Sequence, residues 1–139
     1  MREIKFRGIP IGETAFVYGG HCEIGDRHFI IPADAEYDPD CGGFEPAIFG
    51  VIEVIPESVG QYTGHTDKNG AEIYGEGDIY KDADGIISIV TMADDGWALF
   101  PVKKGTPVRN LYWHNVCNKT KGEVIGNRHQ HPELVEDQT

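Results

Sequence analysis

The chain has 139 residues, of which 40% are hydrophobic and 25% are charged, and its formal net charge is −11. These values fit a folded domain and exclude a disordered chain. The acidic balance also disfavours a broad surface for the phosphate backbone of DNA or RNA.

The first half of the chain predicts short strands that glycine and proline interrupt. Polar and apolar residues alternate in several places, as in a strand with one buried face. We expect Gly19-Gly20 and Gly25-Asp26 to break the chain between two of these strands. The expected elements are strands at Arg2–Arg7, Thr14–Tyr18 and Arg27–Ile31, a loop over Ala33–Pro46, and a buried strand at Ile48–Ile55.

The second half predicts consecutive hairpins. Asn69-Gly70 and Asp84-Gly85 are typical of tight turns, because these residues tolerate positive φ. We find no internal repeat. The expected strands are Gly60–Thr63, Glu72–Tyr74, Ile79–Tyr80, Ile86–Met92, Trp97–Val102, Leu111–Val116 and Glu123–Ile125, with one helical turn at Pro132–Val135.

The predicted fold is mostly β. Short antiparallel strands should form a bent sheet or a small SH3-like, barrel-like meander, with at most a short helical turn near the C-terminus. We treat residues 1–139 as one domain, with an N-terminal part (1–58) and a C-terminal β meander (59–139). No apolar run approaches the ~18 residues of a membrane span. The N-terminus lacks the apolar core of a signal peptide, which predicts a cytoplasmic protein.

The run Gln61–Ile79 is the most informative stretch of the sequence. With Arg2–Arg7 before it, and Glu123–Asn127 and Pro132–Leu134 after it, this run resembles the signature of the YopX-like family of bacterial phages and prophages. The resemblance implies an accessory protein in the cytoplasm of a bacterial host, and no established activity. Gly75 departs from the pattern, and we expect it to place a bulge between two strands.

The motif residues have two interpretations. In the first, which we favour, they shape the backbone: glycines supply turn geometry, Asp67 and Asp78 accept hydrogen bonds from turn amides, and Tyr62 pairs with Tyr74 across a hairpin. In the second, Gln61, Tyr62, Glu76 and Asp78 line a binding surface. The candidate binding residues, with no role assigned, are Gln61, Tyr62, Gly64, Asp67, Asn69, Gly70, Glu76, Gly77 and Asp78.

Two sets of residues have the chemistry of metal ligands. The acidic loop 34–45 has the carboxylate spacing of a calcium-binding loop, but Pro39 stands where that loop needs glycine, so an EF-hand is excluded. A looser calcium site is left open. The other set lacks the two close ligand pairs of a typical zinc site. It comprises His21, Cys22, His28, Cys41, His114 and Cys117. We predict no metal ligand, no cofactor and no disulfide framework.

No arrangement typical of a catalytic site is apparent, so we predict no catalytic residue and favour a noncatalytic interaction module over an enzyme. The charge is unevenly distributed. No lysine or arginine occurs from His28 to Thr66, whereas Lys103–Arg128 is basic. Complementary surfaces of this kind are compatible with a homo-oligomer or an unknown protein partner. The alternatives are a metal-dependent enzyme that uses either ligand set, and, less favoured, a nucleic-acid-associated protein that stacks bases on Tyr112 and Trp113.

Overall fold

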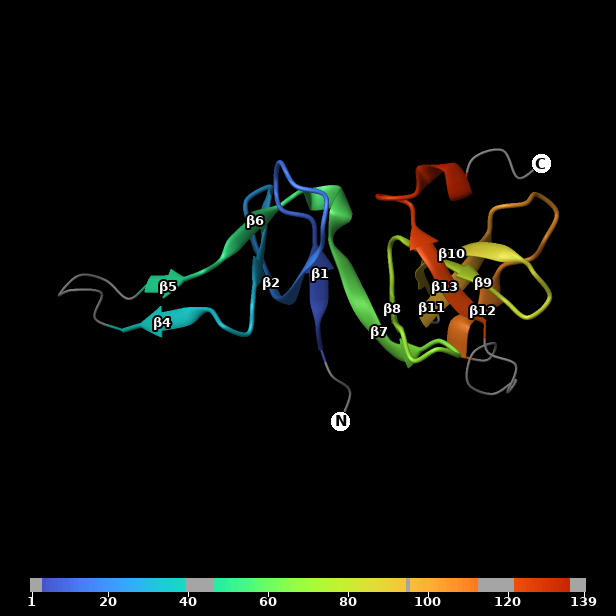
Figure 1. Cartoon of the computed structure of the whole chain (residues 1–139), viewed down its shortest axis with the longest axis horizontal. Helices are drawn as coiled ribbons and strands as arrows, with labels where there is room; N and C mark the ends of the chain where they lie inside the picture. Colours follow the sequence, from blue (N-terminus) through green and yellow to red (C-terminus); the bar gives the residue numbers. More distant parts are fainter. Residues whose placement is uncertain (1–3, 40–46, 95, 113–121, 136–139) are drawn as a thin grey trace. The chain divides into compact units, whose positions relative to one another are not determined.

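The structure is a computed structural model that describes residues 4–39, 47–94, 96–112 and 122–135. It is mostly β, and its strands pair antiparallel, as predicted (Figure 1). Two structural units are distinguished: Ile4–Val59, and the described residues from Gly60 onward. No helix among the described residues has the length and apolar character needed to cross a membrane.

The first unit is built on the strand order β6-β3-β2-β1. Ile30 and Val54 are fully buried in it, and Gly8 lies so close to Val54 that an added Cβ would be 2.9 Å from its side chain. A 3-10 turn, η2, closes the unit, where the Ser58 hydroxyl accepts a hydrogen bond from the Ile9 amide at 2.8 Å. The elements are β1 (Phe6–Gly8), β2 (Val17–Ile24), β3 (Arg27–Ile31), β6 (Ile52–Val54) and η2 (Pro56–Ser58).

Several expectations for this unit are wrong. The strand expected over Thr14–Tyr18 begins only at Val17. Gly19-Gly20 lies inside β2 rather than breaking it, because a Cβ at Gly19 would be 2.1 Å from the Ile31 carbonyl oxygen and the strands approach closely there. The expected loop contains β4 (Glu36–Asp38), which pairs with β5 (Ala47–Phe49). The strand expected over Ile48–Ile55 is split into β5 and β6 at Gly50, whose φ of +89° interrupts an extended chain.

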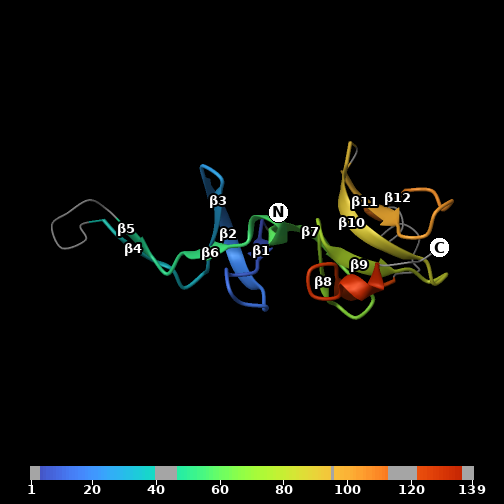
Figure 2. The same ribbon diagram turned by 90° about the horizontal axis from the view of Figure 1, so that it is seen from above.

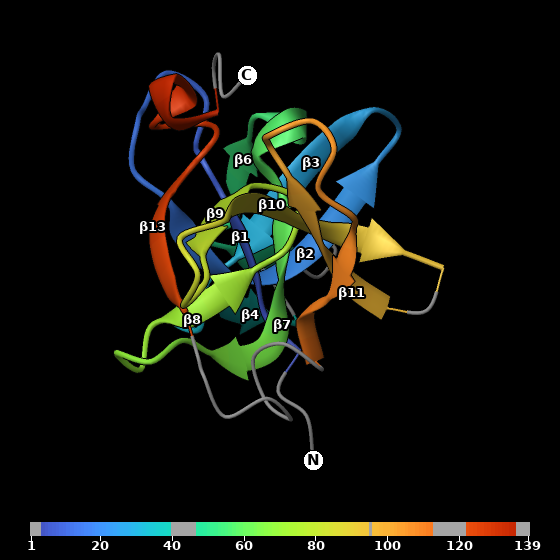
Figure 3. The ribbon, with the colours of Figure 1, turned by 90° about the vertical axis from the view of Figure 1, so that its right-hand side faces the viewer.

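The second unit contains a hairpin and a five-stranded sheet with the order β12-β11-β10-β9-β13 (Figure 3). The predicted meander is present as β9, β10 and β11, and the predicted C-terminal turn is present as η4. The elements are β7 (Gly60–Thr66), β8 (Glu72–Tyr74), β9 (Asp78–Lys81), β10 (Ile87–Ala93), β11 (Gly96–Pro101), β12 (Arg109–Asn110), β13 (Glu123–Asn127) and η4 (Pro132–Leu134).

The core of the second unit lies against the five-stranded sheet. Tyr80 is buried there, and its hydroxyl accepts a hydrogen bond from the Gly122 amide at 2.6 Å. The strand expected over Leu111–Val116 is wrong at its start, because Leu111 and Tyr112 are helical; 113–116 lie outside the described residues. The core comprises Ile73, Tyr80, Val90, Leu99 and Leu111, with Trp97 and Val124 packed against it.

Gly75 is needed for packing. It lies in the turn between β8 and β9, so the bulge expected there is absent, and a Cβ on it would be 2.0 Å from the Trp97 ring. Gly75→Ala should therefore lower the free energy of unfolding by about 1–3 kcal/mol, measured by urea denaturation. Gly20→Ala is the control, since its Cβ would meet Ile31 only at 3.9 Å. Equal effects of the two substitutions would contradict the packing argument.

Candidate functional site

Two loops of the second unit have the same backbone geometry, although no internal repeat was expected. They are Asp67–Ala71 and Asp82–Ile86, and both have the pattern Asp-x-Asx-Gly-x. In each, the amide of the aspartate donates to the carbonyl of the fifth residue, at 2.8 Å and 3.0 Å, and the glycine amide donates to the aspartate carbonyl at 3.0 Å. Gly70 and Gly85 both have φ of +83°. The five-residue pattern is thus a structural repeat.

The aspartate side chain holds each loop closed. One carboxylate oxygen of Asp67 accepts hydrogen bonds from the amides of Asn69 and Ala71, each at 2.9 Å. Asp82 does the same for Asp84 and Ile86, also at 2.9 Å. The two aspartates are only 3% and 5% exposed. Buried carboxylates need such partners, so both side chains are committed to their loops.

The second oxygen of each aspartate fixes a distant segment. Asp67 accepts from the Val124 amide of β13 at 2.8 Å. Asp82 forms an ion pair and a hydrogen bond with Arg109 of β12. Burial raises the pKa of Asp82, but the hydrogen bond from Ile86 and the interaction with Arg109 outweigh it, so that the pKa lies below its ordinary value. Both loops are thereby bound to the sheet.

The turn between β8 and β9 uses two further carboxylates of the motif. Asp78 accepts from the Tyr74 amide at 2.7 Å. Glu76 accepts from the Thr91 hydroxyl at 2.9 Å and from the Met92 amide at 3.0 Å. The prediction that Asp67 and Asp78 accept from turn amides is therefore confirmed. We expected the motif glycines, Gly77 among them, to supply turn geometry. For Gly77 this is wrong, because the residue of this turn with a positive φ, 63°, is Glu76.

The remaining motif residues lie in and around β7. The ring centroids of Tyr62 and Tyr74 lie 5.6 Å apart with the rings tilted, so the predicted pair is confirmed. Gly64, with φ of +86°, lies where the β7–β8 register shifts, which places the bulge inside β7. The Gln61 carbonyl accepts from the Gly75 amide at 2.9 Å, and the Asn69 side chain donates to Glu123 at 3.4 Å. A role of these residues in binding stays a prediction.

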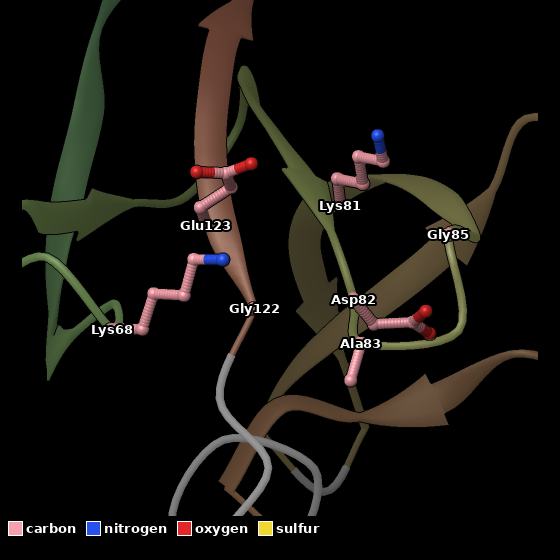
Figure 4. A pocket seen from close by; sticks show the side chains of 7 residues that line it. All are labelled: Lys68, Lys81, Asp82, Ala83, Gly85, Gly122 and Glu123. Atoms are coloured by element: carbon pink, nitrogen blue, oxygen red, sulfur yellow. The ribbon is translucent and has the colours of Figure 1, made fainter.

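A pocket of about 340 Å³ opens between the two loops, and we call it the two-loop cleft (Figure 4). Lys68 of the first loop and Lys81 of β9 line it, and both side chains are exposed. The backbone of Gly122 lies between them, where a Cβ would be 2.2 Å from the Lys81 carbonyl oxygen. The cleft is lined by Lys68, Lys81, Asp82, Ala83, Gly85, Gly122 and Glu123.

The cleft can hold an anionic group. Two ammonium groups and the carboxylate of Glu123 border it, and the buried carboxylate of Asp82 is already neutralised by Arg109, so the lining keeps one excess positive charge. The candidate residues from the sequence did not include Lys68, Lys81 or Gly122. The repeated Asp-x-Asx-Gly pattern was the signal that could have identified both loops.

The two sets of residues with the chemistry of metal ligands are only partly brought together. His21 Nε2 and His28 Nδ1 are 2.9 Å apart on β2 and β3, and Phe6 packs beside His21. Cys22 is a free thiol on β2. Among the parts of the chain that the structure describes, no group of three or more metal-ligating side chains is placed to hold an ion. Asp34 and Glu36 of the acidic loop are exposed, whereas Asp40, Cys41, Glu45, His114 and Cys117 lie outside the described residues.

Removing the Asp67 side chain tests the loop architecture. Asp67→Ala leaves three amides, those of Asn69, Ala71 and Val124, without their acceptor, so the free energy of unfolding should fall by about 2–4 kcal/mol. Asp84→Ala, an exposed acid of the other loop, should change it by less than about 0.5 kcal/mol. Urea denaturation measures both. A loss for Asp67→Ala as small as that of the control would show that the carboxylate does not hold the loop.

The histidine pair predicts a pH dependence. Burial, followed by the neighbouring His28, lowers the pKa of His21 below its ordinary 6.5. The unfolded chain therefore binds a proton more readily, so this contribution to stability is present above pH 6.5 and is lost as the pH falls through the folded pKa. Titration followed by NMR should place the His21 midpoint below 6.5. His28→Gln should move that midpoint upward, and a midpoint at or above the ordinary value would contradict the assignment.

Comparison with known proteins identifies the family. The model of the family described as YopX protein matches residues 26–136, which is most of the chain and includes both loops of the cleft. No match to the chain was found among curated proteins. The sequence resemblance is thus confirmed, and the chain belongs to the YopX family.

Proposed function

We propose that this YopX protein is a noncatalytic binding module, and that the two-loop cleft binds an acidic segment of a protein partner. The observation that carries the proposal is the engagement of the motif carboxylates. Asp67, Glu76 and Asp78 all accept hydrogen bonds from backbone amides, an arrangement that suits a framework better than an acid, a base or a nucleophile.

The cleft is preorganised for such a ligand. Because Asp67 and Asp82 fix both loops, little conformational entropy is lost when a ligand binds between them. Lys68 and Lys81 are exposed and carry positive charge at neutral pH. Hydrogen bonds from ammonium to carboxylate are stronger than those between neutral groups. An acidic peptide therefore fits the chemistry of the cleft.

A protein ligand is favoured over a nucleic acid. A nucleic acid would bring a continuous row of phosphates past Glu123 of the same cleft and across a protein of net charge −11, whereas an acidic segment need place only single carboxylates beside the two lysines. Arg109, the arginine nearest to the cleft in the basic segment, is half-buried and paired with Asp82. In line with the resemblance, we place this module in the cytoplasm of a bacterial host, as a phage accessory protein that can self-associate.

Affinity capture tests the proposal. The tagged full chain is used to retain proteins from bacterial host cells, and the retained proteins are quantified by mass spectrometry. Lys68→Ala/Lys81→Ala should reduce the specific partner about tenfold or more, because it removes two charge-assisted contacts. Arg128→Ala, an exposed cation outside the cleft, should leave retention unchanged. Equal retention by all three proteins would exclude the cleft as the binding site.

A second experiment tests whether Asp67 supports the fold or contacts the ligand. Asp67→Asn keeps one acceptor oxygen, so partner binding should fall only as far as stability does. A variant of unchanged stability that loses the partner would instead assign Asp67 to the binding surface.

A further inference from the structure

The β4–β5 hairpin, which we call the arm, is poorly supported within its own unit. Its two strands pair with each other in a separate two-stranded sheet, and among the described strands none extends that sheet. The arm leaves the β2–β3–β6 sheet after Pro32 and returns at Gly50 (Figure 2). A lone two-stranded hairpin is marginally stable in water, so the arm requires a covering surface.

The exposed side chains of the arm indicate the chemistry of that surface. Tyr37 is 64% exposed, the same value as Ile24, and the two are among the most exposed large hydrophobic residues of the described chain. Asp34 and Glu36 are exposed beside it, and no lysine or arginine occurs from His28 to Thr66. Glu36 and Tyr37 are consecutive in β4 and point to opposite faces, so a surface that covers the acidic face should be cationic.

The second unit carries a surface of this kind. Lys68 and Lys81 are exposed in the two-loop cleft, and a second hollow of about 200 Å³, to which Lys103 contributes, borders the same loop at Gly85. Asp84, Ile86 and Ile87 also line that second hollow, so it carries one acid and apolar surface beside Lys103. By contrast, Arg27 of the first unit is paired with Glu53 at 2.6 Å.

We propose that the arm of one copy docks on the two-loop cleft of a second copy, with Asp34 and Glu36 facing Lys68 and Lys81. This inference rests on the proposed function, because it names an occupant of the same cleft. Each chain carries both halves of the contact, so two copies can exchange arms reciprocally and make the contact twice in a closed dimer. Exposed ion pairs are screened by salt, so the association should weaken as ionic strength rises.

Charge reversal tests the contact in the full chain. Sedimentation equilibrium at low salt, from about 1 to about 200 μM, should show a dimer for the wild type. Asp34→Lys/Glu36→Lys and Lys68→Glu/Lys81→Glu should each weaken dimerisation by about tenfold or more, since like charges then meet. The controls are Glu13→Lys/Glu57→Lys, which matches the charge change of the arm variant, and Arg128→Glu, which makes half the charge change of the cleft variant; both reverse exposed charges outside the arm and the cleft. Urea denaturation establishes that each variant is folded.

Mixing the two charge-reversed variants shows whether the arm that docks on the cleft comes from a second copy or from the same chain. In each variant alone, the arm and the cleft carry like charges and repel each other between copies. In the mixture, the lysine arm of the first variant meets the glutamate cleft of the second. The unchanged acidic arm of the second variant meets the unchanged lysine cleft of the first. A 1:1 mixture should therefore recover the dimer. A wild type that stays monomeric, or reversed variants that dimerise like the wild type, would overturn the inference. So would a mixture that fails to recover the dimer. Cleft-dependent capture of another protein by a monomer would leave the proposed function intact.

Discussion

The buried carboxylates of Asp67 and Asp82 are the constraint on which the second unit depends. Removing a carboxylate from water is costly unless hydrogen bonds replace the lost hydration. Each aspartate meets this cost by accepting two amides of its own loop and one partner from a distant strand, Val124 or Arg109. Loop closure and sheet assembly are thus coupled through single side chains. The two-loop cleft exists because both loops are fixed to the same sheet.

Strands that local patterns define were predicted well. Arg27–Ile31 and Glu72–Tyr74 have the predicted bounds, because alternation and turn residues act over only a few positions. Elements that depend on distant partners were predicted poorly. β4 lies in an acidic stretch that reads as a loop and is a strand only through its pairing with β5. Leu111 belongs to a short apolar run whose periodicity cannot separate strand from helix.

The candidate site shows the same division. The capping roles of Asp67 and Asp78 and the Tyr62–Tyr74 pair follow from residue type and short spacing, and the sequence predicted them. The reason for Gly75 is the position of the Trp97 ring, 22 residues away in the chain, and no local pattern contains it. The cleft itself joins three separate segments, so its lining could be found only once the sheet was known.

The loop pattern also separates the residues that hold the backbone from those that face a ligand. In Asp-x-Asx-Gly, the aspartate and the glycine fix the geometry, whereas the side chain of the second residue takes no part in closing the loop and is exposed. That second residue is Lys68 in one loop and Ala83 in the other, and both line the cleft. A substitution there changes the charge of the cleft without removing a hydrogen bond of the framework. A family motif of this kind can therefore preserve a fold while the ligand differs from one member to another, since function resides in the exposed positions that the scaffold presents.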